Sequence, residues 1–186
     1  GEIGQLRMLT AEHGQGLGHV PAEHRLKNPA LAGGAMLDLT VYPVSFAHDM
    51  LGAPDEVRAL GTLTETGVDA SEAISLRYGD RAVALLGASL VAATPNAAVV
   101  TGSTGRVEIA GTFYAPSTLT IRPREGEERQ VSPAVGSGFE YQAAEVARRV
   151  HAGERESPVH SWAGTVEVMA TMDEARRQLG VRLPGE

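Results

Sequence analysis

The amino-acid sequence predicts an α+β fold, built on an open, predominantly antiparallel (mixed) β-sheet of about six strands with helices on one face. Two observations predict this class. Short segments rich in apolar and β-branched residues follow one another between residues 57 and 122, separated by turn residues. Apolar residues recur at helical spacing on both sides of this region. The 186 residues are expected to form one domain, 1–186.

The first elements are predicted to be a strand, a loop and a helix. Residues 5–13 are predicted as a strand, and the stretch 14–31, rich in Gly, His and Pro, as a long loop. A helix is predicted over about 34–51. Pro43 lies inside this helix, where it removes one backbone donor. We therefore expect a kink near residues 39–43.

The central region is predicted to contain strands at 57–66, 73–78, 81–92, 97–101, 106–111 and 117–122. Their short connections can join only antiparallel neighbours. The segment 81–92 is apolar at successive positions, which is typical of a strand with both faces covered. Because the chain has too few helices to cover both faces, the sequence predicts an exposed apolar sheet face that forms a homodimer or higher homo-oligomer.

Two helices are predicted near the carboxyl end, at 139–152 and about 161–179. In the second, Val166, Met169, Met172 and Leu179 recur at helical spacing, and Gly180 is typical of a helix end. Methionines at this spacing indicate core packing rather than a cofactor site.

Composition excludes several classes of function. The formal net charge of −7 and the pI near 5.4 argue against binding to nucleic-acid phosphates, and no Lys/Arg cluster changes that. No stretch approaches the ~20 apolar residues of a membrane span, so no membrane contact is expected. The absence of cysteine excludes disulfides, thiolate catalysis and Cys-based zinc sites, and it fits a cytoplasmic location.

The run 25–43 places a carboxylate, Asp38, and a phenol, Tyr42, four residues apart. Positions i and i+4 share a helix face, and the helix would open after Gly33 and Gly34 with unpaired backbone N–H groups. Spacing alone favours an ordinary pair on a helix surface, with a solvated carboxylate and a half-buried aromatic ring. The apolar neighbours on all sides instead indicate a protein-lined site that could hold a polar substrate.

Several motifs along almost the whole chain resemble one known family. They are Gly-Glu-Ile-Gly-Gln-Leu at 1–6, Gly-Gly-Ala-Met-Leu-Asp-Leu-Thr-Val-Tyr-Pro at 33–43, Pro-Asp-Glu-Val at 54–57, Thr-Gly-Val-Asp at 66–69, Gly-Phe-Glu-Tyr-Gln at 138–142 and Gly-Glu-Arg-Glu-Ser-Pro at 153–158. On these motifs the chain resembles the C-terminal substrate and oligomerisation domain of the Gfo/Idh/MocA-type oxidoreductases. That family includes glucose-fructose oxidoreductase, inositol dehydrogenase and dihydrodiol dehydrogenase.

The resemblance implies an N-terminal dinucleotide-binding (Rossmann) domain, which we expect to be absent from this chain. No strand is followed by Gly-x-Gly-x-x-Gly and a helix; the nearest candidate, at 14–18, has the wrong spacing and is followed by Pro21. The implied function is that of an NAD(P)-dependent oxidoreductase that transfers a hydride between NADP or NAD and a sugar, polyol or trans-diol. The missing domain would bind most of the coenzyme, so the chain alone is expected to be inactive.

The resemblance also implies roles for individual residues. Tyr42 would transfer the hydroxyl proton and Asp38 would orient the substrate or the phenol, with a lysine of the missing domain as the nearby cation. Tyrosine at position 42 resembles the sugar and diol branch, since the inositol branch typically has histidine there. Thr40 departs from the glycine common at its position. Further candidates are Arg25 and His160 for substrate binding, and Gly33, Gly34 and Tyr141 for cofactor binding.

Two other readings of the sequence are a metal site and a non-catalytic module. The histidines His13, His19 and His24 fit no common metal-ligand spacing, so no metal is expected and solvated loop histidines are favoured. The alternative function is a dimerisation or ligand-sensing module that kept the fold without the chemistry.

Overall fold

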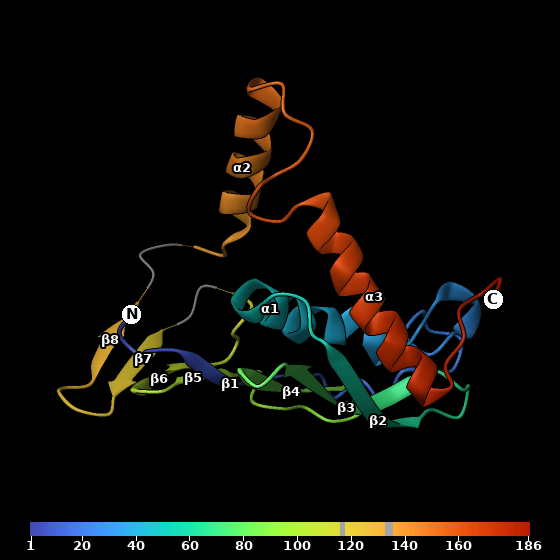
Figure 1. Cartoon of the computed structure of the whole chain (residues 1–186). Helices are drawn as coiled ribbons and strands as arrows, with labels where there is room; N and C mark the ends of the chain where they lie inside the picture. Colours follow the sequence, from blue (N-terminus) through green and yellow to red (C-terminus); the bar gives the residue numbers. More distant parts are fainter. Residues whose placement is uncertain (116–117, 133–135) are drawn as a thin grey trace.

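Figure 1 shows the computed structural model of the chain, which describes residues 1–115, 118–132 and 136–186. The strands are β1 (Leu6–Gly14), β2 (Glu56–Leu63), β3 (Asp69–Tyr78), β4 (Ala82–Ser89), β5 (Ala98–Gly102), β6 (Gly105–Ile109), β7 (Leu119–Pro123) and β8 (Arg129–Val131). The helices are α1 (Val41–Leu51), α2 (Phe139–His151) and α3 (Trp162–Leu179), with a short 3₁₀ helix η1 (Pro29–Leu31) and a single π-helical turn η2 (Met36–Thr40).

All eight strands form one open sheet in the order β2-β3-β4-β1-β5-β6-β7-β8. Every neighbouring pair is antiparallel except β1 and β4, which run parallel. The predicted α+β class and the mixed, mainly antiparallel sheet are therefore confirmed, with eight strands instead of about six. The strand that was not predicted is β8, at the edge of the sheet, and its three residues are too few to show a pattern. Of the strand predicted at 117–122, residue 117 lies outside the described residues.

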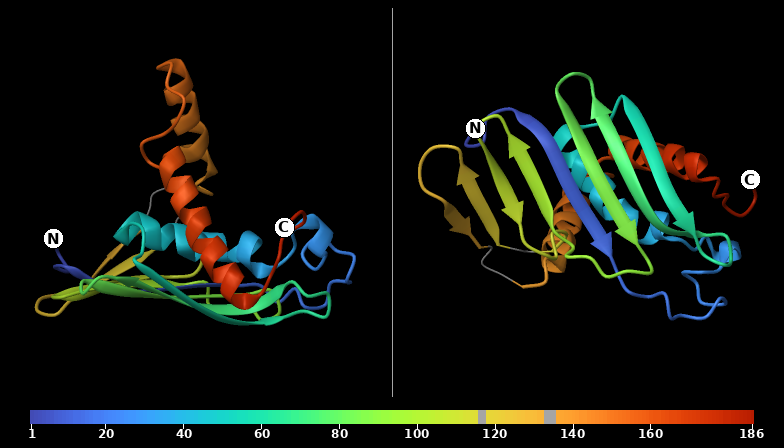
Figure 2. Two further views of the ribbon diagram at one scale, coloured as in Figure 1. Left: turned by 45° about the vertical axis from the view of Figure 1, so that its right-hand side comes forward. Right: turned by 90° about the horizontal axis from the view of Figure 1, so that it is seen from below.

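The helices α1 and α3 pack on one face of the sheet, as the two views in Figures 1 and 2 show. The core between these layers joins β1, β3 and β4 to α1 and α3; its buried members include Leu9, Ile74, Leu76, Val44 and Met172. Of the methionines predicted to lie in the core, Met172 is buried, but Met169 is 37% exposed. The helix α2 has no buried residue and stands away from the sheet.

The opposite face of the sheet is bare in the described residues, as the right-hand view of Figure 2 shows. The strand β4 alternates, so that Ala82, Ala84 and Leu86 face the helices while Val83 and Leu85 are 42% and 44% exposed. This confirms the predicted exposed apolar face.

The helix predicted over 34–51 is present, and its first turn is irregular. Residues Met36–Thr40 form a π turn that runs directly into α1. Pro43 has no N–H to donate to the carbonyl of Leu39, four residues earlier, so the regular hydrogen-bond ladder is interrupted where the kink was expected.

The segment Pro29–Leu51, 23 residues long, has the length and composition of a helix that could cross a membrane. The expectation that no segment approaches such a span is therefore wrong. Many of its side chains pack inside the protein, among them Met36, Leu39 and Val44. Burial in a core selects the same apolar residues as a membrane does, and this packing accounts for the composition.

Candidate active site

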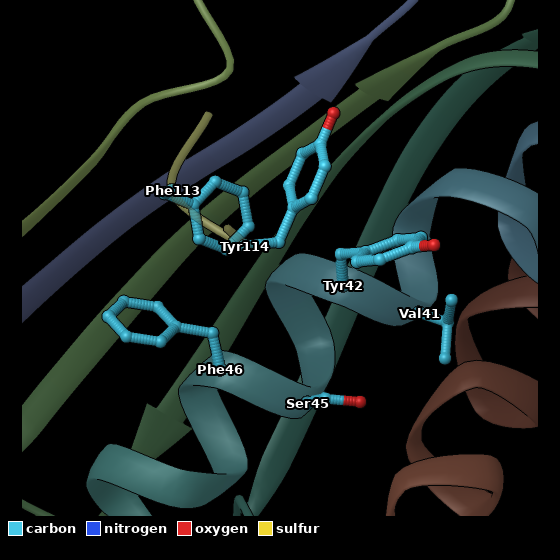
Figure 3. Close-up of a pocket in the computed structure, with 6 residues that line it drawn as sticks. All are labelled: Val41, Tyr42, Ser45, Phe46, Phe113 and Tyr114. Carbon is cyan, nitrogen blue, oxygen red and sulfur yellow. The ribbon is translucent and has the colours of Figure 1, made fainter. Parts of the chain in front are cut away.

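An aromatic hollow of about 320 Å³ lies where α1 meets the segment that follows β6. Figure 3 shows its lining residues, with Phe113 and Tyr114 on that segment and the others on α1. The lining residues are Val41, Tyr42, Ser45, Phe46, Phe113 and Tyr114. A second hollow of about 580 Å³ shares Tyr42, Phe113 and Tyr114 and continues to the start of α2, where Phe139 lines it. All three phenylalanines of the chain thus line these two hollows.

Tyr42, the predicted proton-transfer residue, sits on the wall shared by both hollows. Its side chain is 42% exposed. The ring of Tyr42 lies 4.7 Å from that of Tyr114 and meets the ring of His13 edge-on at 4.9 Å, both measured between centroids. These contacts hold the phenol in place at the mouth of the hollow.

His13 on β1 is a site residue that the sequence analysis missed. The expectation of a solvated loop histidine is wrong, since His13 is only 1% exposed. Its Nδ1 lies 3.3 Å from the Leu39 carbonyl, to which Pro43, four residues later, has no N–H to donate. A carbonyl only accepts, so Nδ1 carries the hydrogen, and Nε2 accepts from the Gln15 side-chain amide at 3.1 Å. Burial lowers the pKa of His13, which therefore supports Tyr42 as a neutral ring.

Asp38 lies on η2, and its carboxylate accepts a hydrogen bond from the Arg25 guanidinium at 2.7 Å. The side chain of Asp38 is 29% exposed and that of Arg25 is 63% exposed, so the ion pair faces solvent. The structure thus brings together two of the predicted site residues, Arg25 and Asp38. The pair presents a charged, hydrogen-bonding edge one helical turn before Tyr42.

The backbone at Gly33 and Gly34 differs from the prediction of unpaired N–H groups. Gly33 N–H donates to the Asn28 carbonyl at 3.0 Å and Gly34 N–H to the Leu26 carbonyl at 2.9 Å. The next two N–H groups, of Ala35 and Met36, donate to the carboxylate of Asp69 on β3. That prediction is wrong because the preceding loop supplies the acceptors for Gly33 and Gly34, and β3 supplies the acceptor for Ala35 and Met36.

At both positions the packing leaves no room for a side chain, which explains why glycine stands there. A Cβ on Gly33 would lie 2.6 Å from the Arg25 carbonyl oxygen, and one on Gly34 would lie 2.2 Å from Asp69 Oδ1. The start of this helix is therefore filled by the chain itself and does not fit a coenzyme phosphate. Cofactor binding by Gly33 and Gly34 stays an untested prediction that this packing does not favour.

His160 and Tyr141 lie apart from Tyr42 in the described contacts. His160 is exposed and pairs with Ser157 in a short antiparallel bridge just before α3. Tyr141 is 53% exposed on α2, although its neighbours Phe139 and Gln142 line the second hollow. The roles assigned to both residues stay predictions.

The charged and metal-ligating residues add no metal centre. Among residues 1–115, 118–132 and 136–186, no group of three His, Cys, Asp or Glu side chains could hold a metal ion. Lys27, a cation of the loop, is buried and donates to Glu65 and to the Gly18 carbonyl. Its role there is to pin the loop 14–31 against the β2–β3 turn.

The chain matches the family of GFO/IDH/MocA C-terminal domains over residues 1–108. It is 33% identical over 190 residues to the trans-1,2-dihydrobenzene-1,2-diol dehydrogenase of Xenopus tropicalis, and 31% identical over 193 residues to the human enzyme of that name. These alignments cover 98% and 99% of the chain and 57% of each relative. The chain therefore spans little more than half the length of the curated relatives that it matches.

Solved structures share the fold at lower sequence identity. The aldose-aldose oxidoreductase of Caulobacter crescentus, complexed with glycerol, superposes with a TM-score of 0.82 at 20% identity, covering 97% of this chain and 55% of the other. A 3-ketoreductase of Actinomadura kijaniata, in complex with NADP and TDP-benzene, superposes with a TM-score of 0.75 at 22% identity, covering 96% and 55%.

Proposed function

Because the chain belongs to the GFO/IDH/MocA family, we propose that it is the substrate-binding part of an NAD(P)-dependent oxidoreductase acting on a sugar, polyol or trans-diol. The observation that carries the proposal is the position of Tyr42, on the wall of an aromatic hollow and one helical turn after the Arg25–Asp38 ion pair. The names of the relatives, which are dehydrogenases and reductases of diols and sugars, support the substrate class.

The reaction requires two contributions from this chain, proton exchange and substrate binding. The bound nicotinamide would exchange a hydride with the carbinol carbon of the substrate. In the oxidative direction the substrate hydroxyl must then lose its proton, and Tyr42 at the mouth of the hollow is the acid/base group available to exchange it. The Arg25–Asp38 pair would hydrogen-bond a second hydroxyl of a sugar or diol. The aromatic wall would pack on the apolar face of the ring.

We propose that the coenzyme is held by a part of the protein that this chain does not include. The packing at Gly33 and Gly34 supports this, since the amide groups of residues 33–36 are all engaged within the chain. The coverage of the relatives is consistent with it, because more than two fifths of their length lies outside the matched region. The choice between NADP and NAD belongs to that part.

We expect the 186-residue chain to bind a cyclic trans-diol weakly at the aromatic hollow. Saturation-transfer NMR with trans-1,2-cyclohexanediol as the probe would detect this binding. Tyr114→Ala should weaken the affinity by about three- to tenfold, because one aromatic contact contributes ~0.5–1.5 kcal/mol. The matched control is Trp162→Ala, which removes an aromatic ring, 61% exposed, that lines neither hollow. Equal saturation transfer in wild type and Tyr114→Ala would place the ligand elsewhere.

We propose that the bare sheet face mediates homo-oligomerisation. Leu60, Val83 and Leu85 are exposed on that side of the sheet, at 81%, 42% and 44%. Charged side chains flank this apolar strip at both ends, with Arg77 and Glu56 paired at 2.7 Å on one side and Arg106 and Glu108 paired at 2.7 Å on the other. An apolar centre with a charged rim is the usual composition of a protein interface.

Sedimentation velocity at micromolar concentration should show a dimer or larger assembly for the wild-type chain. Leu85→Glu should shift the protein to monomer, because a buried unpaired carboxylate in the interface opposes association. Val159→Glu is the control, since it adds the same charge at an exposed apolar residue in the turn before α3. A monomeric wild type, or an equally assembled Leu85→Glu variant, would exclude this face as the interface.

A further inference from the structure

Two acidic side chains of β3, Asp69 and Glu72, are buried directly beneath η2. Their exposed fractions are 2% and 5%. Residues three apart on a regular strand point to opposite faces. Here the pairing with β2 shifts register between Thr62 and Leu63, so that Asp69 pairs with Leu63 and Ser71 with Thr62. This bulge turns the Asp69 side chain toward the helix layer, where Glu72 already points.

The two carboxyl groups bind both ends of the π turn. Asp69 accepts hydrogen bonds from the N–H groups of Ala35 and Met36 at its start. Glu72 Oε1 accepts from the Thr40 hydroxyl at its end. Asp38 lies between these two attachment points, so the acid pair determines where this turn, and its carboxylate, can lie.

The geometry leaves a place for one proton between the acids. Among the described residues Glu72 Oε2 is buried and has no donor. The Glu72 and Asp69 carboxyl groups are close enough for a side-chain hydrogen bond, which can form only if one of the two carries a hydrogen. Two adjacent buried carboxylates would repel each other in a medium that screens poorly, whereas a carboxylic acid and a carboxylate attract.

The pKa shifts agree with this geometry. Burial, and then the charge of Asp69, raises the pKa of Glu72 from its ordinary value near 4.5 to about 8. Burial also raises the pKa of Asp69, against the hydrogen bonds from Met36 and Ala35 that favour its charged form.

The surrounding elements supply no cation to the pair. β4 has no titratable side chain, η2 carries Asp38, and β2 carries Glu56 and Arg58, which pair with each other. Lys27 of the neighbouring loop is engaged by Glu65. The charged side chains of α3 are Glu167, Asp173, Glu174, Arg176 and Arg177. None of these shifts the pKa of Glu72, for which Asp69 is the charged neighbour that does.

We propose that Asp69 and Glu72 share one proton at neutral pH and that this proton positions η2, and with it Asp38, for the substrate. The pair is a positioning device, since neither residue reaches the hollow. The first half of the proposal concerns the chain alone, and the second half rests on the proposed function. When the shared proton leaves, above about pH 8, the repulsion between the acids loosens both attachments of the turn.

The first test follows the backbone amides of Met36 and Thr40 by ¹⁵N NMR of the 186-residue chain from pH 5.5 to 9.5. In wild type both amides should shift together, with one midpoint near 8. Glu72→Gln should abolish that transition, because the amide keeps a donor for Asp69 and an acceptor for Thr40 but does not titrate. Glu12→Gln, the same change on the opposite face of the sheet, should leave the midpoint unaltered.

The second test is the melting temperature against pH. A carboxyl group with a raised pKa binds its proton more tightly in the folded chain, so its stabilisation is complete at low pH and is lost as pH rises from about 4.5 to 8. Wild type should therefore lose stability over this range, whereas Glu72→Gln should not, and at pH 8 the variant should melt at a higher temperature than wild type.

Infrared spectroscopy of wild type alone covers the case in which the variant fails to fold. A protonated carboxyl band present at pH 7 and absent at pH 9.5 would support the shared proton. A spectrum without that band, or unshifted Met36 and Thr40 amides, would overturn the proposal. Neither result depends on substrate or coenzyme, so failure here leaves the proposed function standing.

Discussion

Replacing Tyr42 by phenylalanine is expected to lower the turnover of the complete oxidoreductase by about 10²–10⁴-fold, the usual contribution of a positioned acid/base group. The phenylalanine ring can keep the contacts of Tyr42 with His13 and Tyr114, at 4.9 and 4.7 Å between ring centroids. The hollow should therefore retain its shape, and only the hydroxyl that exchanges the proton is lost. Coenzyme affinity should stay near normal, because the amides that precede the helix are engaged within the chain.

Steady-state kinetics on a protein that contains this chain and its coenzyme-binding part would measure the effect, together with a separate coenzyme titration. Tyr78→Phe is the matched control. Tyr78 is 3% exposed on β3, and its hydroxyl has no hydrogen-bond partner among the described residues, so its removal should change neither turnover nor folding. Unchanged turnover in Tyr42→Phe would remove Tyr42 from the mechanism, whereas a wild type without turnover would favour the non-catalytic alternative.

Replacing Gly34 by alanine is expected to destabilise the folded chain by about 2–4 kcal/mol, which combines backbone strain with the loss of a buried cap. The φ angle of Gly34 is +126°, a backbone conformation that residues other than glycine rarely adopt. A Cβ there would also lie 2.2 Å from Asp69 Oδ1. Asp69 would have to move away from the N–H groups of Ala35 and Met36, and the start of the helix would lose its acceptors.

Urea unfolding of the 186-residue chain would measure this difference. Gly180→Ala separates the two causes, because Gly180 also has a positive φ, +74°, but a Cβ there meets no heavy atom within 4 Å. We expect this control to cost only about 1 kcal/mol, the strain of the left-handed backbone. An equal loss of unfolding free energy in both variants would show that the close contact between Gly34 and Asp69 does not contribute to stability.

The elements that were predicted well are those whose pattern is local. The helix after Gly34 and the helix ending at Gly180 were predicted from periodicity and end signals that lie within a few residues of one another. The polar start of β3 at Asp69 was missed because it carries no local strand pattern. It is a strand because it pairs with β2. The short strand β8 carries too few residues for any pattern.

The candidate site was predictable in part. Asp38 and Tyr42 were proposed because four residues along a helix place two side chains on one face. The structure adds that Arg25, predicted only as a substrate-binding residue, pairs with Asp38. Their catalytic and binding roles stay predictions. Phe113 and Tyr114 were missed although they are adjacent aromatics in a chain with only three phenylalanines and four tyrosines. The small number of aromatic residues could have indicated these two as site candidates, but it does not predict which helix their rings face.

The fold class, the family, the bare apolar sheet face and the helix that carries Asp38 and Tyr42 could all be read from the sequence. Each of them follows from short local patterns or from the number of such patterns, and none requires knowing which strands pair. The contact of His13 with the Leu39 carbonyl, where Pro43 lacks a donor, and the position of Asp69 and Glu72 beneath the π turn became visible only in the folded chain. Those contacts join residues 26 to 33 positions apart. They depend on strand order and on one bulge, which side-chain periodicity does not encode.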